Sequence, residues 1–431
     1  MKTRDWIELD RAHGWHPFTD QAEWEGGEPL VIERGEGVWL FDSEGGRYLD
    51  GNSSIWTNLH GHAHPRINEA MEVQMGKISH SSYLGFANPR ASELAGRLCG
   101  FFPEGILERC FFSDDGSTAL EVALRMALQY FGQNGEGERR EVVAFREAYH
   151  GDTLGAASVG GVGRISHRGG SGYPVRRVGA VEDLEGFEEP ERVAAVVVEP
   201  VVQGVNEIRI WPEGMLRKLR DWCDENGVFL IFDEVMTGFG RTGQMFGCQH
   251  ERVWPDFLCL AKGLSGGYLP LAATLTTGRV YEGFKGAGRG FSYGHSFTGN
   301  QLGCAAALAS LDVFVEERVM EGLGRKVEVF REVLEEVKSS DPEVYEVRQV
   351  GLVAGIEYRR TDGEFFAQRG AKGREICARL RERGVLTRPI LDTVVLMPPL
   401  AISEEELRWL GEVFCSEESL MLDEKKEGNG V

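Results

Sequence analysis

The sequence predicts an α/β fold, with a large domain whose mainly parallel sheet is flanked by helices, and a smaller α+β domain. The first observation is a series of short apolar runs between residues 109 and 276, namely "CFF", "EVVAF", "VAAVVV", "VFLIF", "DFLCL" and "LAATLT". Continuous apolar strands of this kind suit a parallel sheet that is covered on both faces. The second observation is a change after residue 317, where charge-rich helices alternate with strand-like runs, as in an α+β domain.

The remaining elements follow in chain order. Residues 30–51 carry a hairpin signal, because Gly-rich turns separate short apolar runs. Residues 70–78 and 90–102 have the spacing of amphipathic helices. Residues 109–131 combine a short strand, a turn and a long helix, and residues 303–319 predict a helix of small residues. There are no internal repeats.

Composition narrows the function classes. The 431 residues include 47 Lys and Arg against 68 Asp and Glu, a net charge of −21. Such a chain is repelled by nucleic-acid phosphates and anionic lipid surfaces, so we expect small-molecule partners, with no nucleic acid and no membrane. The eight cysteines show no C-x-x-C spacing, the first 20 residues lack the apolar core of a signal peptide, and no run resembles a membrane span. We therefore expect a cytoplasmic protein.

Lys262 is the first candidate for chemistry. It ends the apolar run "DFLCLAK" and precedes a Ser-Gly-Gly turn, where the pattern predicts that the chain enters a core. Burying an unpaired ammonium is costly, so such a lysine is paired, neutral or covalently used. A lysine that simply reaches solvent at a strand end is the commoner case, so this residue alone decides little.

Asp233 ends a second apolar strand, "FLIFD", where a carboxylate needs a partner. A cationic heterocycle would satisfy it. The next residues contain G-x-G-x-x-G at Gly238, Gly240 and Gly243, but no helix pattern opens there and no acidic strand end follows about 20 residues on. We interpret this match to a dinucleotide fingerprint as accidental.

Two turns have the features of anion sites. Gly116 lets a ligand approach the backbone, and Ser117 stands at the start of a long helix, although the pattern also fits a plain N-cap. Ser296 lies in a second Gly-rich turn before a helix of small residues. Both turns could hold a phosphate.

Three further features can be interpreted either as structural or as functional. Tyr149 and His150 follow the strand "EVVAF", so an aromatic face could lie over a planar ligand or pack in the core. Arg388 ends a strand and could bind a carboxylate in bidentate fashion, or stay a surface residue. His60, His62 and His64 alternate, but a metal site needs more ligands in matching geometry, so we expect no metal.

One ligand satisfies most of these features, namely pyridoxal phosphate (PLP), a planar, phosphorylated, cationic aldehyde. Asp233 would keep the pyridine nitrogen protonated, and Lys262 would form the Schiff base and then move the proton. Gly116, Ser117 and Ser296 would bind the phosphate. Asp233 and Lys262 lie 29 positions apart, enough for a strand end, a loop and the next strand.

The motifs "DEVMTGFGRTG", "LAKGLSGGYLP" and "HSFTGNQLGCAAA" resemble those of the class III, fold-type I aminotransferases, over residues 14–415. Within that class, "HGWHPFTD", "DGNSSIWTNLHGHAHP", "EPVVQG" and "LTRPILDTVVLMPPL" are similar to the branch that acts in biotin biosynthesis. The resemblance implies PLP-dependent transamination of 8-amino-7-oxononanoate to 7,8-diaminononanoate. S-adenosylmethionine or lysine would be the amino donor.

The resemblance also implies an organisation. Residues 1–56 would begin the small domain, residues 57–317 would form the large PLP-binding domain, and residues 318–431 would complete the small domain, with a frayed tail from about residue 416. The protein would be a homodimer whose active sites are shared across the interface.

Further residue roles are carried over from the resemblance. His295 and Ser296 of one subunit would bind the phosphate that Gly116 and Ser117 of the other subunit hold. Tyr149 would stack on the cofactor ring, and Gln203 would lie near its phenolic oxygen. Arg388 would bind the carboxylate of the keto acid. The substrate pocket would be lined by Phe18, Ile55, Trp56 and Gly294.

The chain departs from the branch at three places, and the first two bear on the donor. Members that use S-adenosylmethionine usually carry a tyrosine where Phe18 stands and a tryptophan where Ile55 stands. The missing indole removes cation–π stabilisation of a sulfonium, worth about 0.5–2 kcal/mol, and this favours lysine as donor. The third departure is residues 202–209, "VQGVNEIR", which lack the usual small, Gly-rich continuation.

Three other functions stay open. An ω-amine or diamine:pyruvate aminotransferase would share every cofactor residue and differ in the pocket. An NAD-dependent dehydrogenase would rest on the segment "GFGRTG" and would show no visible absorption band. A non-catalytic PLP-binding protein would show a band that no amine donor bleaches.

Overall fold

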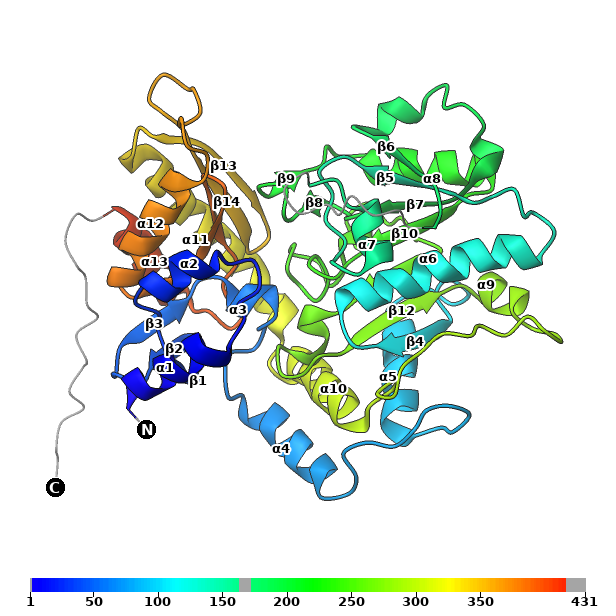
Figure 1. The fold of residues 1–431 in the computed structure, drawn as a ribbon, viewed down its shortest axis with the longest axis horizontal. Helices are drawn as coiled ribbons and strands as arrows, with labels where there is room; N and C mark the ends of the chain where they lie inside the picture. The colour runs from blue at the N-terminus through cyan, green and yellow to red at the C-terminus, as the bar shows by residue number, and fades with distance from the viewer. Residues whose placement is uncertain (1, 163–171, 416–431) are drawn as a thin grey trace.

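The computed structural model describes residues 2–162 and 172–415, and Figure 1 shows them as two lobes side by side. The middle of the chain forms the large lobe, whereas segments from both ends of the sequence form the small one. The tail that the sequence predicts to be frayed lies outside the described residues. No helix in the described ranges has the length and apolarity needed to cross a membrane.

The large lobe is built on a seven-stranded sheet of order β4-β12-β11-β10-β7-β5-β6. Strands β11, β10, β7, β5 and β6 are parallel to their neighbours in that series, and β12 is antiparallel to both β11 and β4. The bounds are β4 (Arg109–Ser113), β5 (Glu141–Phe145), β6 (Val175–Val178), β7 (Val193–Val198), β10 (Phe229–Asp233), β11 (Phe257–Leu260) and β12 (Ala272–Thr276). The apolar runs of the sequence thus form a mainly parallel sheet, as predicted.

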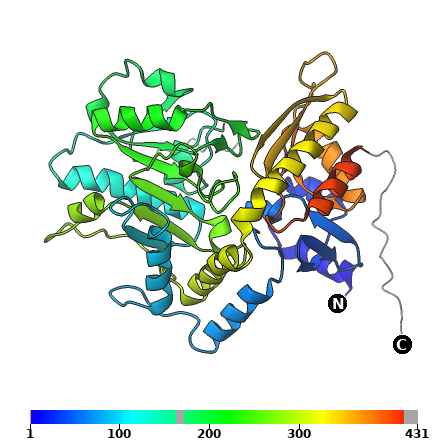
Figure 2. The same cartoon turned by 180° about the vertical axis from the view of Figure 1, so that it is seen from behind.

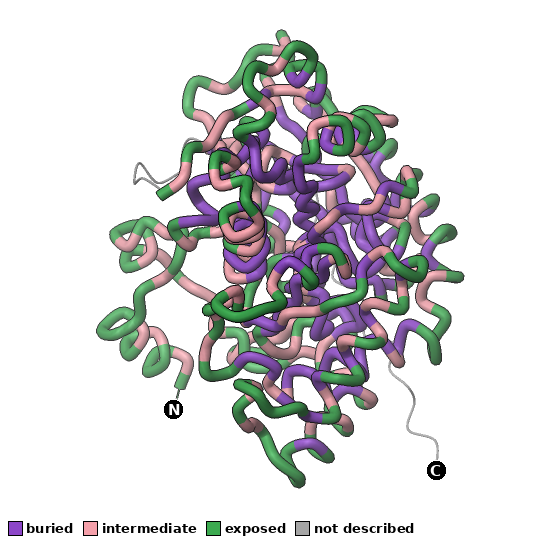
Figure 3. The backbone as a smooth tube through the Cα atoms, turned by 90° about the vertical axis from the view of Figure 1, so that its right-hand side faces the viewer, coloured by how far each residue is buried: buried purple, intermediate pink, exposed green. Residues whose placement is uncertain are grey.

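Helices cover both faces of this sheet. Along β10, Phe229 and Ile231 belong to the apolar cluster that includes helix α6, whereas Leu230 and Phe232 belong to the cluster that includes α5, α8 and α10. The two-residue period of a strand puts both sets of side chains in core, which explains why the run is apolar without alternation. Figure 3 shows the resulting buried centre of the molecule. The helices of this lobe are α4 (Pro65–Met75), α5 (Pro89–Cys99), α6 (Gly116–Gln133), α7 (Leu154–Val159), α8 (Met215–Asn226), α9 (Gly278–Gly283) and α10 (Gln301–Glu316).

The small lobe joins segments that are far apart in sequence. One sheet has the order β1-β2-β3-β15, in which the short β15 (Val385–Leu386) pairs in parallel with β3 (Arg47–Asp50). The other sheet has the order β13-β14-β17-β16. The remaining strands are β1 (Ile32–Glu36), β2 (Trp39–Asp42), β13 (Val344–Val350), β14 (Val353–Tyr358), β16 (Arg388–Ile390) and β17 (Thr393–Leu396). Both chain ends therefore build the smaller α+β unit, as predicted.

Three helices pack on the small lobe, namely α11 (Val319–Ser340), α12 (Ala371–Glu382) and α13 (Glu404–Cys415). Helix α11, yellow in Figure 2, runs from the end of α10 along β13. The predicted boundary at residue 317 falls in the turn between α10 and α11. The exact domain limits remain predictions.

Several short elements were not predicted. Helices α1 (Thr3–His13) and α2 (Gln21–Gly26) lie at the surface and bury no residue. A two-stranded ribbon, β8 (Val202–Gln203) and β9 (Arg209–Ile210), follows β7. The turn α3 (Ser53–Trp56) is left-handed, because its four residues have φ values from 47° to 68°. Such a run is costly for L residues, so the surrounding contacts must hold it.

Candidate active site

A cavity of about 410 Å³ lies at the carboxyl ends of the large-lobe strands. Its lining comes from residues that follow β5, β7, β10 and β11, from the start of α6 and from the segment around α3. The carboxyl edge of a parallel sheet is the usual ligand site of α/β proteins. Six residues predicted from the sequence line this cavity together: Trp56, Gly116, Ser117, Tyr149, Asp233 and Lys262.

Lys262 lies at the sheet edge beside Asp233, because Asp233 is in register with Cys259 on the neighbouring strand. Its Nζ lies 4.5 Å from the ring centroid of Trp56. Burial lowers the pKa of Lys262 to about 8, although Asp233 and Glu199 favour the charged form. The residue also has a φ of 44°, an unfavourable backbone conformation of the kind that concentrates at functional sites. A lysine held in this way is a competent nucleophile and base near neutral pH.

Asp233 is paired with a buried histidine. Oδ2 of Asp233 lies 2.7 Å from Nδ1 of His150, and Oδ1 accepts a hydrogen bond of 3.1 Å from the backbone N–H of Val235. Burial alone would lower the pKa of His150, but the contact with Asp233 outweighs it and the pKa is raised. The His150 imidazolium thus places a positive charge against the buried Asp233 carboxylate. Sequence reasoning considered His150 only as part of an aromatic face and missed this role.

Glu199 is a second buried carboxylate that sequence reasoning missed. It follows β7 directly and accepts hydrogen bonds from the backbone N–H groups of Tyr149 (3.2 Å) and Gly204 (3.0 Å). Burial raises the pKa of Glu199 to about 7, with His150 opposing the rise and Asp233 adding to it. An acid directly after the run "VAAVVV" was the available signal, the same one that identified Asp233. His150, Glu199, Asp233 and Lys262 are called the cavity floor below.

The start of helix α6 supplies the anion end of the cavity. Asp115 caps the helix by accepting the N–H of Thr118 at 2.9 Å. Among the described residues, no acceptor faces the backbone N–H groups of Gly116 and Ser117. Two free amides at the positive end of an 18-residue helix form a ready site for a phosphate.

Close packing explains the glycines around this end. A Cβ on Gly116 would lie 2.7 Å from Cγ1 of Val235. A Cβ on Gly151, whose φ is 114°, would lie 2.1 Å from Oγ of Ser117. Ser117 Oγ also accepts the backbone N–H of Asp152 at 3.1 Å. Only glycine fits at positions 116 and 151 without movement of these neighbours.

Tyr149 stands half-buried between the floor and the α6 end. Its hydroxyl donates to Oδ2 of Asp152 at 2.7 Å. Burial, together with this hydrogen bond, raises the pKa of Tyr149, so the phenol stays protonated. The ring is therefore fixed at its hydroxyl end and available for stacking at its face.

Other predicted residues lie outside the cavity lining. Gln203 is fully buried; its amide donates to the carbonyl of Arg146 at 3.1 Å and accepts from Asn206 at 2.9 Å. His295 Nδ1 lies 3.4 Å from Oδ2 of Asp114, a cavity residue, while Ser296 and Gly294 are exposed. Their roles at the cofactor stay predictions.

The remaining substrate-pocket candidates are also exposed in the single chain. Phe18 is 65% and Ile55 46% exposed. Arg388 lies on β16, exposed, and makes no hydrogen bond or ion pair within residues 2–162 and 172–415. These three side chains are thus available to a ligand or to a second subunit, and their roles stay predictions as well.

The segment with three spaced glycines has a structural role. Residues 234–246 form turns and no helix, so the β-turn-α geometry of a dinucleotide site is missing from this described segment. Arg241, fully buried, donates to the carbonyls of Asn58 (2.6 Å) and Pro398 (2.8 Å). Glu234 accepts the N–H of Cys248 at 2.8 Å. The loop therefore ties the large lobe to the segments that lead into the small one.

The three alternating histidines bind separate partners. His60 contacts Ser310 at 2.9 Å, and His62 contacts Asp50 at 2.9 Å. His64 reaches a glutamate near the end of α10, also at 2.9 Å. Each ring thus has its own protein partner.

A class III aminotransferase family model matches residues 21–416, so the chain belongs to the class III aminotransferases. It is 46% identical to the adenosylmethionine-8-amino-7-oxononanoate aminotransferase of Nitratidesulfovibrio vulgaris, over 93% of this chain and 79% of that protein. It also resembles the crystal structure of the Methanocaldococcus jannaschii enzyme of the same name, with TM-score 0.91, 37% identity and coverage of 96% and 98%. A third likeness is to a PLP-bound amine transaminase from an uncultivated Pseudomonas species, with TM-score 0.86, 32% identity and coverage of 93% and 97%.

The predicted class, fold type and transaminase chemistry are therefore confirmed, and the cofactor is pyridoxal phosphate. The cavity fits this group. It offers free backbone amides at the α6 end for a phosphate, the Asp233 carboxyl group for a pyridinium, and a lysine with a depressed pKa. The nitrogen Nε2 of His150 is buried and has no partner among the described residues, as expected beside a polar ligand.

Proposed function

We propose that this chain transfers an amino group to 8-amino-7-oxononanoate and so forms 7,8-diaminononanoate in biotin biosynthesis. The observation that carries the proposal is the cavity floor, where Lys262 with a pKa of about 8 stands beside the Asp233–His150 pair. The substrate assignment is supported by the relatives of that name, which match over most of this chain.

Each residue has a role in holding PLP. The amides of Gly116 and Ser117 bind its phosphate, because a helix start favours an anion. Asp233 would pair with its ring nitrogen, Tyr149 would stack on its ring and Lys262 would hold it covalently. When bound, PLP supplies an electron sink for the substrate carbon that loses a proton.

The residues of the chain then move and hold protons. The neutral amine of Lys262 would take the proton at Nζ from the carbon that bears the donor's amino group, and would release it again within the same site. Since its pKa is about 8, a substantial fraction is neutral near physiological pH. His150 acts as a positioning residue, because its contact at 2.7 Å holds the Asp233 carboxylate in place.

A homodimer with shared sites completes the proposal. Phe297, beside Ser296, is 55% exposed, and Leu84 and Phe86 are 72% and 70% exposed, so a subunit interface would cover large apolar side chains. In this arrangement His295 and Ser296 of one subunit reach the phosphate of the other. Mixing Lys262→Ala subunits with Ser296→Asp subunits tests it. Shared sites restore about half of the wild-type turnover in the mixed dimer, whereas sites within one chain restore none.

Lysine is the proposed amino donor. Ile55 and Phe18 supply neither the indole nor the hydroxyl that a sulfonium donor would contact, which supports lysine. The relatives are named for adenosylmethionine, so the two donors must be compared directly.

The deciding experiment is the visible spectrum of the purified protein with each donor. Loss of the band of the lysine-bound cofactor with one donor, and its return with 8-amino-7-oxononanoate, identifies both substrates. A band that neither donor bleaches would move the amine transaminase function, supported by the likeness to the Pseudomonas enzyme, to first place. Absence of any band would contradict the role of Lys262.

The state of the cysteines supports a cytoplasmic location. All eight are free thiols, including the exposed Cys415. Free thiols persist in a reducing compartment, which supports the cytoplasm.

A further inference from the structure

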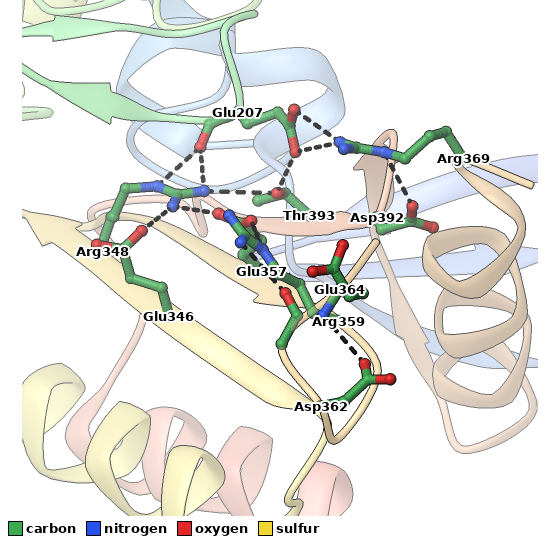
Figure 4. A network of polar contacts seen from close by, with 11 residues as sticks. Glu207, Glu346, Arg348, Glu357, Arg359, Asp362, Glu364, Arg369, Asp392 and Thr393 are labelled. Carbon is green, nitrogen blue, oxygen red and sulfur yellow. Dashed lines mark hydrogen bonds and ion pairs between the residues drawn. The ribbon is translucent and has the colours of Figure 1, made fainter. Parts of the chain in front are cut away.

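The turn between β8 and β9 joins the two lobes through one acidic residue, Glu207. Its carboxylate accepts from the hydroxyl of Thr393 at 2.8 Å and from Nη2 of Arg369 at 3.1 and 3.3 Å. Its main-chain carbonyl accepts from Nε and Nη2 of Arg348 at 3.1 and 2.8 Å. Figure 4 shows these three side chains of the small lobe converging on Glu207. We call Glu207, Arg348, Arg369 and Thr393 the Glu207 clasp.

The small lobe is shaped to receive this turn. Glu207 and Ile208 have φ values of 53° and 57°, a region that L residues avoid. Gly355 on β14 leaves the room for them, because a Cβ there would lie 3.0 Å from Cβ of Ile208 and 3.2 Å from the carbonyl oxygen of Glu207. Residues 204–208 thus dock on the small lobe. This contact explains why the segment "VQGVNEIR" lacks the small, Gly-rich continuation that is usual in the branch.

Acidic residues hold the cations of the clasp in place from the small-lobe side. Arg348 contacts Glu357 at 2.5 Å and also pairs with Glu346. Nε of Arg369 lies 3.3 Å from Asp392. Both guanidinium groups are therefore oriented by their own lobe before Glu207 reaches them, so they form a preorganised receptor.

The same turn forms part of the active-site cavity. We call the apolar lining residues Trp56, Val202, Val205 and Met236 the cavity wall. The wall packs through Ile208 on Val353, Val395 and Met397 of the small lobe. Val395 is the partner of Arg388 across the β16–β17 pair. A single short path therefore runs from the cavity wall to the strand that carries Arg388.

We propose that Glu207 is a positioning residue that fixes the β16–β17 strands on the cavity wall and so sets the place of the Arg388 guanidinium. This rests on the proposed function, in which Arg388 receives the substrate carboxylate. A polymethylene chain separates that carboxylate from the reacting carbonyl, so the cation must stand at a set distance from Lys262. Without the clasp, Arg388 samples more positions and the carboxylate loses affinity, while the apolar chain still binds.

The test compares two probes that differ only in the carboxylate, nonanoate and nonan-1-ol, on the holoenzyme by isothermal titration calorimetry. The KM for 8-amino-7-oxononanoate is measured alongside. Glu207→Gln is expected to raise the Kd of nonanoate and this KM by about 2- to 30-fold, with kcat and the Kd of nonan-1-ol within about twofold of wild type. The matched control is Glu332→Gln, which removes an exposed acid that pairs with Arg408 within the small lobe, away from the clasp, and leaves every value within about twofold.

Two results would overturn the inference: wild-type affinity for nonanoate in Glu207→Gln, or an equal loss of nonanoate and nonan-1-ol. Arg388→Ala separates this failure from failure of the proposed function. If Arg388→Ala leaves the ratio of the two Kd values unchanged, Arg388 does not bind the carboxylate and the substrate orientation itself is wrong. Should Glu207→Gln fold poorly, Thr393→Val removes one donor to the same carboxylate and is expected to shift the ratio in the same direction.

Discussion

The cavity floor and the cavity wall are held in place by different kinds of contact. The floor consists of residues at the ends of four strands of one sheet, where His150 and Asp233 are buried and contact each other at 2.7 Å. The wall is apolar and packs on a separate lobe, to which it is tied by the half-buried Glu207 clasp. Strand register fixes the floor, whereas contacts between lobes fix the wall.

This difference separates chemistry from recognition. A change in the floor alters proton transfer for every substrate, because all of them react at Lys262. A change in the wall or the clasp alters only the substrates that use the small lobe. The predictions below are ordered from the largest expected effect to the smallest, and each can break that separation.

The largest effect is expected from Lys262→Ala. Turnover should fall by about 10⁴-fold or more with every donor and acceptor, because the nucleophile and the base are lost together. Steady-state rates and the visible spectrum check it. Lys326→Ala is the matched control, since Lys326 is a half-buried lysine of the small lobe that donates to the carbonyl of Leu400. Substantial remaining turnover in Lys262→Ala would refute the mechanism.

Asp233→Asn should follow, with a loss of about 10²- to 10³-fold in kcat for all substrates alike. The substitution also changes how the free energy of unfolding depends on pH. The pKa of His150 is raised above 6.5, so its pairing contributes fully below pH 6.5 and is lost as pH rises through the raised pKa. Urea titrations from pH 5.5 to 9 should show this decline in wild type and not in Asp233→Asn. If kcat fell for one substrate only, the floor would also take part in substrate recognition, and the proposed separation of chemistry from recognition would be wrong.

Lys262 should also be reactive in the apoprotein. With a pKa of about 8, about a quarter of the amine is neutral at pH 7.5, roughly 200 times the neutral fraction of an ordinary lysine. Competitive acetylation followed by mass spectrometry measures its titration, with the exposed Lys218, whose pKa is raised by Glu182, as internal reference. A midpoint near 10 would contradict the electrostatics of the floor.

The smallest effect concerns the donor. Ile55→Trp combined with Phe18→Tyr should raise the ratio of kcat/KM for S-adenosylmethionine over lysine by about 2- to 30-fold, because an indole stabilises a sulfonium. Phe365→Tyr, the same chemical change on an exposed phenylalanine of the small lobe, should leave the ratio unchanged. An unchanged ratio in the double variant would remove the argument for lysine.

The floor and the wall also differ in how far the sequence predicts them. Asp233, Lys262 and Gly116 were predictable, because each follows a continuous apolar strand and strand ends gather at one edge of a parallel sheet. His150 and Glu199 were missed as partners, because only the strand order places β7 beside β10 and β5 beside β7. Glu207 was beyond prediction, since its partners Arg369 and Thr393 lie 162 and 186 positions away.

Because β3 pairs with β15, a segment near the start of the chain gains its hydrogen-bond partners only when residues near the end have been synthesised. The N–H of Gly51 donates to the carbonyl of Leu386 at 2.9 Å, the N–H of Met397 donates to the carbonyl of Gly51 at 2.8 Å, and the hydroxyl of Ser53 donates to the carbonyl of Met397 at 2.6 Å.

At about 5–20 residues per second, a ribosome makes Leu386 roughly 20 to 70 s after Gly51. The left-handed turn that carries Trp56 is without these partners for that whole interval. Nascent chains arrested before Leu386 should therefore fail to retain PLP, and chains released after Met397 should retain it. Retention of PLP by a nascent chain would therefore indicate that the strands up to Met397 have been synthesised and have folded.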